Sequence, residues 1–324
     1  MITINPENIQ KWSQLGSRGA FGAAMMELGE TMDNLVVLTA DLSDATRVTQ
    51  FKEKFPEKFY NVGIAEQNLV GIACGLAKEG KTVFATTFAA FAAMRCCEQV
   101  RTNMGYMKLN VKLLGADGGV VMGTLGNTHY AVEDIAITRA MPNMTVLSPA
   151  DGLEIIKATI AASRMNGPVY IRLTGAANNP IVYTEDYDFE IGKAVTLKEG
   201  TDLTIIATGT MVAESVEAAA LLEKKGLSVR LVDMHTIKPL DTDVIRKACS
   251  ETGAIYTVEE HSTIGGLGGA VAETVSEIAG SPRLVRIGLP DSFGKIGTYR
   301  HQLERYGLTG PQIAQRILDE TASH

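Results

Sequence analysis

Short apolar runs rich in β-branched residues alternate with longer amphipathic stretches, and this alternation limits the folds open to the chain. Such runs predict buried strands at Leu35–Thr39, Thr82–Ala85, Val111–Leu114, Thr145–Leu147 and Val169–Leu173. The stretches between them predict helices at Arg18–Glu30, Glu66–Lys78, Phe91–Tyr106 and Gly152–Ser163. Strands that alternate with helices form parallel sheets with helices on both faces. The first half is therefore predicted to be a doubly wound α/β domain.

A second α/β series follows an acidic, aromatic linker at Thr184–Phe189. Its expected strands are Leu203–Ala207, Val229–Asp233, Ala254–Val258 and Leu284–Ile287, and its expected helices are Val212–Lys225, Asp243–Thr252 and Gly269–Ile278. With 324 residues the chain is long enough for two domains. We expect both to be doubly wound α/β domains, at residues 1–186 and, somewhat smaller, 187–324.

Composition excludes several classes of function. The net charge is −7 and no basic stripe occurs, which argues against nucleic-acid binding. No apolar run is long enough to span a membrane, and the polar segment Met1–Gln10 does not have the pattern of a secretory signal. The four cysteines form no C-x-x-C pair. Cys96 and Cys97 lie in an Ala-rich stretch and are expected to be buried thiols, in keeping with a cytoplasmic protein.

Three stretches carry candidate chemistry. Glu66 follows a loop of small residues at the start of a predicted helix, where it could simply favour the positive end of the helix dipole or be a functional carboxyl in a partly dry pocket. Phe88 and Phe91 follow a predicted strand, at the edge of the sheet where α/β proteins bind ligands. They could be core residues or could wall a flat heterocycle. His129 ends the Gly-rich loop that begins at Gly123, and capping is as good an interpretation as catalysis.

Taken together, the motifs resemble those of a known family. Gly63-Ile64-Ala65-Glu66-Gln67, Thr87-Phe88 with Phe91, and Thr128-His129 occur in the order and spacing of the pyrimidine-binding domain of transketolases and deoxyxylulose-phosphate synthases. The second half resembles the carboxy-terminal domain of the same families at Ala207-Thr208-Gly209-Thr210, Lys238-Pro239-Leu240, Glu259-Glu260-His261, Leu289-Pro290-Asp291 and Tyr306-Gly307-Leu308.

The resemblance implies a role for each matching residue. The carboxyl at the position of Glu66 meets the pyrimidine nitrogen of thiamine diphosphate and promotes activation of the cofactor, which then accepts a two-carbon ketol unit from a ketose. Phe88 and Phe91 would wall the pyrimidine ring, with Ile64 in the same cofactor-binding set. His129 would stabilise charge on the transferred unit. The two-carbon unit would then pass to an aldose or another carbonyl acceptor.

Half of the implied site has no counterpart here. Single-chain members bind the diphosphate through a divalent metal in an amino-terminal domain. The nearest string, Gly115–Gly119, is better explained as a turn at a strand end, so no metal ligand is assigned to this chain. We expect no segment before Met1 to supply one. Mg²⁺ and its ligands are therefore expected on a separate amino-terminal transketolase chain, with two copies of each chain in an α2β2 assembly.

Several positions depart from the family pattern. Leu125 stands where the family usually has an Asp that senses a substrate hydroxyl, and a Leu accepts no hydrogen bond. Arg18 matches an arginine that holds the substrate phosphate, but Asp117 replaces an expected His. An expected Arg appears as Thr174-Gly175, and an expected Ser as Ala45. Because charge-assisted hydrogen bonds are the strong ones, these losses predict an unusual ketose that is branched, sulfonated or nonphosphorylated.

Two alternatives remain open from the sequence. A β chain of a 2-oxo acid dehydrogenase shares this layout and would release carbon dioxide instead of transferring a ketol unit. A non-catalytic regulatory paralogue would tolerate the changes along the substrate channel. It would have no need to keep a buried carboxyl, which is costly unless it is used.

Overall fold

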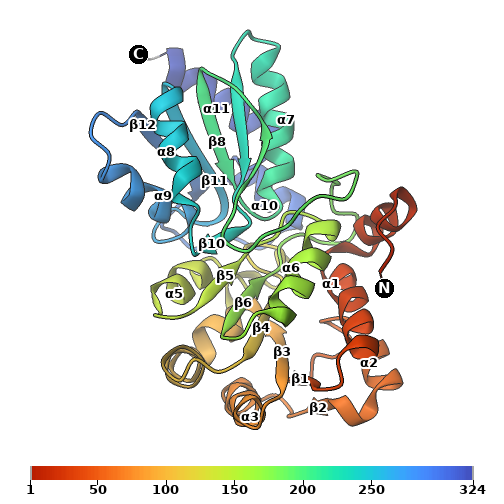
Figure 1. Cartoon of the computed structure of the whole chain (residues 1–324). Coiled ribbons are helices and arrows are strands. Elements are labelled where there is room, and N and C mark those ends of the chain that lie inside the picture. Colours follow the sequence, from red (N-terminus) through yellow and green to blue (C-terminus); the bar gives the residue numbers. More distant parts are fainter. Residues whose placement is uncertain (1, 323–324) are drawn as a thin grey trace.

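The computed structural model describes residues 2–322, so the terminal His324 lies outside it. Two sheets form, one from mainly the first half of the chain and one from the second, and they lie one above the other in Figure 1. The prediction of two α/β domains with mostly parallel sheets is confirmed.

The first sheet has the strand order β10-β5-β6-β4-β3-β1-β2. Its strands are parallel except for β10, which pairs antiparallel with β5. The bounds are β1 Leu35–Thr39, β2 Phe59–Asn61, β3 Thr82–Phe88, β4 Val111–Ala116, β5 Thr145–Leu147, β6 Val169–Arg172 and β10 Thr236–Lys238. Since β10 comes from the second half of the chain, this sheet ties the two halves together.

Helices cover both faces of this sheet because successive strand residues point in opposite directions. Val36 and Leu38 of β1 join one hydrophobic cluster with α3, whereas Leu35 and Val37 join another with α1 and α6. The helical segments of this half are α1 Pro6–Thr31, α2 Thr49–Lys54, η1 Pro56–Lys58, α3 Glu66–Lys78, η2 Phe91–Arg95, α4 Cys97–Gln99, η3 Val100–Tyr106, η4 Gly126–Thr128, α5 Asp134–Ala140 and α6 Gly152–Arg164.

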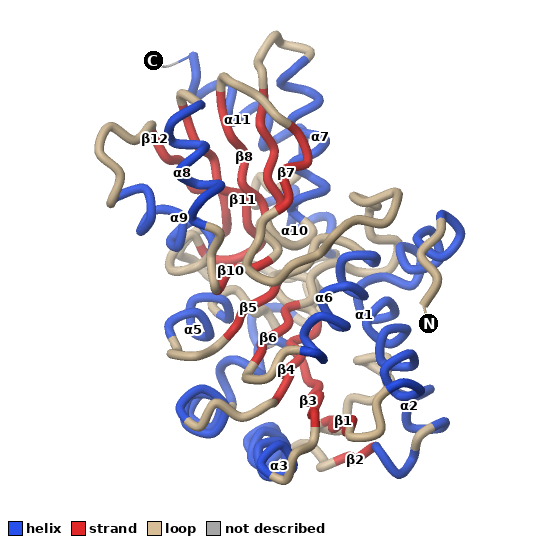
Figure 2. Tube along the Cα trace, viewed as in Figure 1, coloured by secondary structure: helices blue, strands red, loops and turns tan. Residues whose placement is uncertain are grey.

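The second sheet has the order β12-β11-β8-β9-β7 and is parallel except for β7. Its strands are β7 Val195–Lys198, β8 Leu203–Ala207, β9 Val229–Asp233, β11 Ala254–Ser262 and β12 Arg283–Leu289. Its helices are α7 Met211–Glu223, α8 Thr242–Glu251, α9 Leu267–Ser276, α10 Tyr299–Arg305 and α11 Gly310–Ala322. Figure 2 shows α7 and α8 on opposite sides of these strands.

The main departure from the predicted elements is at residues 91–106, where the sequence predicts one α-helix. The segment is instead π-helical in η2 and η3, with a short α-helical turn between them. Single π-helical turns often occur at functional sites, because the extra residue per turn redirects the side chains. Smaller differences are the earlier start of α1, capped by the Asn5 side chain, and the three-residue strands β2 and β10.

The segment between β6 and β7 contains no helix or strand, as the expected linker requires. It is nonetheless packed, since Tyr183 is 7% exposed and its ring stacks on that of Tyr187. A domain boundary after residue 186 stays a prediction. No helix within residues 2–322 is long and apolar enough to cross a membrane.

Candidate active site

Glu66 is the first residue of α3 and its side chain faces inward, with 2% of the residue exposed. The apolar residues of α3 recur with the helix period and pack against the sheet, which directs this first-turn side chain to the sheet edge. One strong donor contacts the carboxylate: Arg95 Nη1 lies 2.6 Å from Glu66 Oε1. A short bond between two charged groups is roughly twice as strong as a neutral one.

Arg95 connects this carboxylate to an aromatic group. Its guanidinium lies over the Phe91 ring, 3.9 Å from the ring centroid. Phe88, the last residue of β3, contacts Phe91 edge-on at a centroid distance of 5.9 Å. The π-helical geometry of η2 places both Phe91 and Arg95 at this edge of the sheet. A buried acceptor and a partly exposed aromatic face are thereby neighbours.

His129 completes the group. Its ring lies 5.4 Å from the Phe91 ring and 6.2 Å from the Phe88 ring, both in edge-on geometry. Its Nδ1 is 2.9 Å from the Thr128 hydroxyl, which leaves Nε2 for other partners. The structure thus brings four predicted residues, Glu66, Phe88, Phe91 and His129, into one continuous set of contacts, with Arg95 as the link.

Arg18 and Asp117 form a separate pair. Arg18 lies on α1 and Asp117 directly follows β4, at a backbone φ of 56°, so Gly115–Gly119 comprises the last two residues of that strand and the bend after it. Arg18 Nη1 is 3.3 Å from Asp117 Oδ2. Asp117 is 2% exposed, and burial raises the pKa of its carboxyl to about 6 despite the opposing charge of Arg18. Within residues 2–322 no hydrogen bond or ring contact joins this pair directly to the aromatic group.

The remaining predicted site residues lie at the surface. Ile64 is 79% exposed in the loop before α3, and Leu125 is 50% exposed on the loop that leads to His129. Neither contacts the aromatic rings through a hydrogen bond or ring pair within the described residues. Their side chains are accessible to a ligand or another chain.

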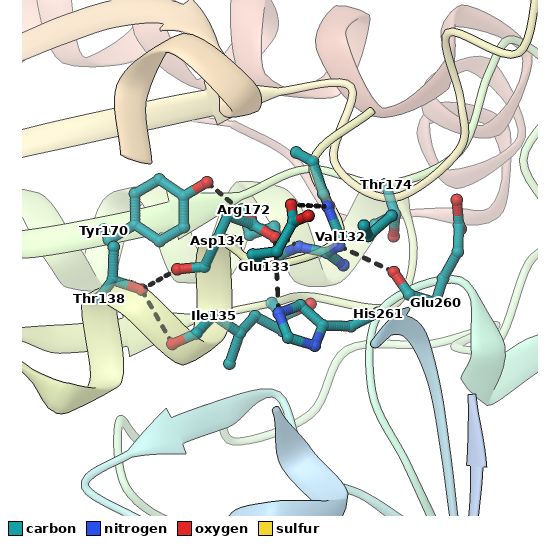
Figure 3. A network of polar contacts seen from close by, with 12 residues as sticks. Val132, Glu133, Asp134, Ile135, Thr138, Tyr170, Arg172, Thr174, Glu260 and His261 are labelled. Carbon is teal, nitrogen blue, oxygen red and sulfur yellow. Dashed lines mark hydrogen bonds and ion pairs between the residues drawn. The ribbon is translucent and has the colours of Figure 1, made fainter. Parts of the chain in front are cut away.

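A buried polar network lies behind the His129 loop, between the two halves of the chain (Figure 3). Arg172 donates to the Asp134 carboxylate at 2.8 Å, and its Nη2 donates to the carbonyls of Ala131 and Glu260. His261 lies 4.0 Å from Asp134, and burial lowers the pKa of its imidazole to about 4. This position fits a packing role for His261.

Comparisons with known proteins agree with the geometry. Residues 13–178 match the family model of the transketolase pyrimidine-binding domain, and residues 192–313 match that of the transketolase C-terminal domain. The chain therefore belongs to the transketolase family.

Relatives of similar length are described as parts of transketolases. A putative transketolase C-terminal section from Methanocaldococcus jannaschii is 45% identical over 94% of this chain and 96% of its own. A 6-deoxy-6-sulfo-D-fructose transketolase subunit from Clostridium sp. is 40% identical, covering 94% of each chain. One of the subunits of an apulose-4-phosphate transketolase from Phocaeicola vulgatus is also 40% identical, over 95% of this chain and 98% of its own.

Solved structures share the fold over the same range. A split gene transketolase, described as an inactive beta4 tetramer, superimposes with a TM-score of 0.84 at 43% identity and covers 94% of this chain and 97% of its own. Transketolase from Campylobacter jejuni superimposes with a TM-score of 0.78 at 25% identity. This chain covers 46% of the Campylobacter protein, so it corresponds to about half of that longer chain.

The family implies thiamine diphosphate, and the residues present fit its aminopyrimidine. The ring needs a carboxylate acceptor beside an aromatic wall, and Glu66, Phe88 and Phe91 supply both. Within residues 2–322 no group of three or more His, Cys, Asp or Glu side chains is placed to hold a metal ion. The fit therefore concerns the aminopyrimidine and not the diphosphate.

Arg95 belongs to the site although the sequence motifs do not predict it. It lies 29 residues from Glu66 in sequence, and it is the last residue of the π-helical segment η2. The signal that could have found it is the cation four residues after Phe91, in a segment otherwise rich in small apolar residues.

Proposed function

We propose that this chain is the C-terminal subunit of a thiamine diphosphate-dependent transketolase, active only when a separate N-terminal subunit completes the site. The observation that carries the proposal is the continuous contact of the buried Glu66 carboxylate with Arg95, Phe91 and His129. When bound, the cofactor supplies the carbon centre that holds the transferred two-carbon unit.

The residues of this chain have distinct roles in this proposal. Glu66 would hold the pyrimidine through a hydrogen bond to its carboxylate and so bias the tautomer of the ring. The low accessibility of the carboxyl keeps competing water away. Phe88 and Phe91 would wall and orient the pyrimidine ring. His129 Nε2 donates to hydroxyls or to the developing oxyanion of the two-carbon unit.

A partner chain is supported by the descriptions of the relatives. Proteins that match this chain over more than nine-tenths of their length are called a C-terminal section, a subunit or a split gene product. The partner would hold Mg²⁺ and the diphosphate, in an α2β2 assembly. A cytoplasmic location is supported by the four free cysteines, of which Cys74 and Cys96 are buried.

The substrate proposal rests on Arg18 and Asp117. A buried carboxylate 3.3 Å from the guanidinium cancels much of the charge that would otherwise attract a phosphate dianion. A ketose with a branched, sulfonated or nonphosphorylated end is therefore proposed, and one relative is named as a subunit of a 6-deoxy-6-sulfo-D-fructose transketolase. Turnover of these ketoses should exceed that of xylulose 5-phosphate; efficient use of the latter would overturn the substrate proposal.

The function itself is tested by calorimetry. Thiamine diphosphate with magnesium is titrated into this chain alone and into its mixture with the candidate N-terminal chain. Binding only in the mixture, together with ketol transfer, is the expected result. Tight binding by this chain alone would overturn the split site, and binding without transfer on any ketose would favour the regulatory alternative.

A further inference from the structure

The loop that carries His129 is anchored at its base by the second half of the chain. We call residues 120–131 the histidine loop. At its start the Val120 amide donates to Glu260 Oε1 at 2.7 Å, and at its end Arg172 Nη2 donates to the Ala131 carbonyl at 3.0 Å. Gly119 and Ala131 close the base with two backbone hydrogen bonds. Arg172 and Glu260 are 1% exposed, and Figure 3 shows both near Val132, the residue that follows the loop.

The tip of the histidine loop is held by a different segment. We call residues 290–298, between β12 and α10, the C-terminal loop. Asn127 Nδ2 donates to the Gly294 carbonyl at 2.8 Å, and the Gly294 amide donates to Asn127 Oδ1 at 3.1 Å. The Gly297 amide adds a bond to the Gly123 carbonyl at 3.0 Å. One side-chain amide thus joins two loops that are 167 residues apart in sequence.

The C-terminal loop is itself fixed, so it can act as a support. Gln302 of α10 is fully buried and donates from Nε2 to the Lys295 carbonyl at 2.8 Å. At Gly294 an added Cβ would come within 1.9 Å of the Tyr306 hydroxyl, so only glycine lets the backbone approach this closely. At the histidine loop an added Cβ on Gly123 would come within 2.5 Å of the Gly297 carbonyl oxygen. The two loops are packed backbone against backbone.

We propose that Asn127 is a positioning residue for His129, and that the C-terminal domain contributes to the active site through this contact. The inference rests on the proposed function for its catalytic consequence. His129 follows Asn127 by two residues, so the place where Asn127 holds the tip helps to set the ring 5.4 Å from that of Phe91. The base anchor at Ala131 fixes where the chain leaves the loop, and Asn127 fixes the tip on the other side of His129. Tyr130, 5% exposed, adds a second attachment to the C-terminal loop, since its hydroxyl lies 3.2 Å from the Gly123 carbonyl and 3.5 Å from the Lys295 carbonyl.

The asparagine amide is suited to this task because it donates and accepts at once. Asn127→Ala removes both bonds. Asn127→Asp keeps the acceptor for the Gly294 amide but places a carboxylate against the Gly294 carbonyl. Thr124→Ala is the matched control, since Thr124 is exposed on the same loop and its hydroxyl makes no hydrogen bond within residues 2–322.

The first arm of the test is hydrogen exchange of residues 120–131 in this chain without any partner. Two net hydrogen bonds at an exposed site correspond to a change of roughly tenfold in the opening equilibrium. Exchange should therefore be roughly tenfold faster in Asn127→Ala, faster also in Asn127→Asp, and unchanged in Thr124→Ala. Exchange in Asn127→Ala that equals that of the unaltered chain would overturn the proposal.

The second arm uses the enzyme assembled with its N-terminal chain. Asn127→Ala should lower kcat roughly tenfold, with thiamine diphosphate affinity unchanged, because Glu66 and the aromatic wall are untouched. A loss of cofactor affinity equal to the loss of kcat would indicate general damage and sink the idea. If the unaltered assembly transfers no ketol unit, the proposed function fails, while the exchange arm still decides whether Asn127 holds the loop.

Discussion

At the scale of single residues, the Glu66 carboxylate is the most constrained group of the candidate site. It is almost inaccessible, it begins a helix whose positive end favours a negative charge, and it accepts a short bond from Arg95. A carboxylate in such a place is costly to keep unless its charge is used. Replacing Glu66 by glutamine, which has the same shape without the charge, therefore tests whether the charge is needed.

Glu66→Gln should abolish most ketol transfer. The amide keeps an acceptor and the side-chain volume but loses the charge that biases the pyrimidine tautomer, so we expect a loss of kcat of about a hundredfold or more. Steady-state kinetics of the assembled enzyme measures it. Glu79→Gln, at the exposed far end of α3, is the control and should be neutral. Near-normal transfer by Glu66→Gln would remove this residue from the mechanism.

The guanidinium of Arg95 already makes the two contacts that the aminopyrimidine would need. It is planar, it stacks on Phe91 and it donates to Glu66. A cofactor ring that uses the same face and the same acceptor must compete with it. Arg95→Ala should therefore bind thiamine diphosphate roughly tenfold more tightly in the assembled enzyme, the gain that corresponds to one charge-assisted bond at a half-exposed position.

Calorimetry on Arg95→Ala, with Arg101→Ala as the control, measures this effect. Arg101 is exposed on η3 and takes no part in the contacts of Glu66. Weaker cofactor binding by Arg95→Ala would mean that the guanidinium supports the cofactor instead of competing with it.

At the scale of elements, the ion pair of β6 with α5 supports the base of the histidine loop. The side chains of Arg172 and Asp134 are 1% and 0% exposed, and the Tyr170 hydroxyl donates to the same carboxylate at 2.8 Å. Removing one member of such a pair leaves an uncompensated buried charge.

Arg172→Met should lower the free energy of unfolding by about 3–5 kcal/mol. Denaturant unfolding of this chain measures it. Lys198 of β7 forms a half-exposed ion pair with Glu223 of α7. Lys198→Met should lower the free energy of unfolding by no more than about 1 kcal/mol. A similar cost for the two substitutions would show that the network is not a stabilising anchor. In the double variant Arg172→Met with Asp134→Leu, part of the loss should be recovered.

Strands and helices of ordinary length are predictable because their pattern is local. The predicted bounds of β1, β5, β8, β9 and α3 agree with the structure, since each is a compact apolar run or a clear helical period between turn residues. The strand β10 escapes prediction because three residues carry too little pattern, and its pairing with β5 joins Thr236 to Leu147. The π-helical turn escapes it because an Ala-rich segment fits an α-helix equally well.

The candidate site likewise contains residues that sequence motifs predict and contacts that they do not. Motifs in single stretches of sequence predict Glu66, Phe88, Phe91 and His129, and the structure brings these residues together. No motif predicts the contacts of Arg95 with Glu66 and of Asn127 with Gly294. Each contact depends on a backbone path that sequence spacing alone does not define. The roles proposed for these residues stay predictions.

At the scale of the whole molecule, the two halves meet around buried carboxyls. Glu154 of α6 accepts from the Tyr187 hydroxyl, and Asp233 of β9 accepts from the Tyr183 hydroxyl, each at 2.7 Å. The two tyrosines stack in the segment between β6 and β7, so this segment connects an acid of each half. Two further buried acids lie on β11. Glu259 accepts hydrogen bonds from the backbone amides of Leu267 and Gly268, and Glu260 accepts one from the amide of Val120.

This arrangement makes the stability of the molecule depend on pH in a defined direction. Burial raises the pKa of Glu154, Glu259 and Glu260 from an ordinary 4.5 to about 7 each, and it raises that of Asp233. Between these values these carboxyls hold more protons in the folded chain than in the unfolded chain, so their contribution to the free energy of unfolding falls as pH rises. The stabilisation is complete below pH 4.5 for these groups and is lost as pH passes about 7. Fewer groups act in the opposite direction: His235 and His261 up to about pH 6.5, and Lys112 above about pH 7, because burial lowers their pKa values.

The unfolding midpoint should therefore be lower at pH 8 than at pH 5.5, by an amount that reflects about 1 kcal/mol per pH unit for each group that releases a proton. Thermal unfolding across this range measures it. Glu154→Gln removes one titrating group while keeping an oxygen for Tyr187, so the pH dependence of its stability should be shallower. If the pH dependence of Glu154→Gln equalled that of the unaltered chain, Glu154 would not release a proton in this range and its part of the prediction would be wrong.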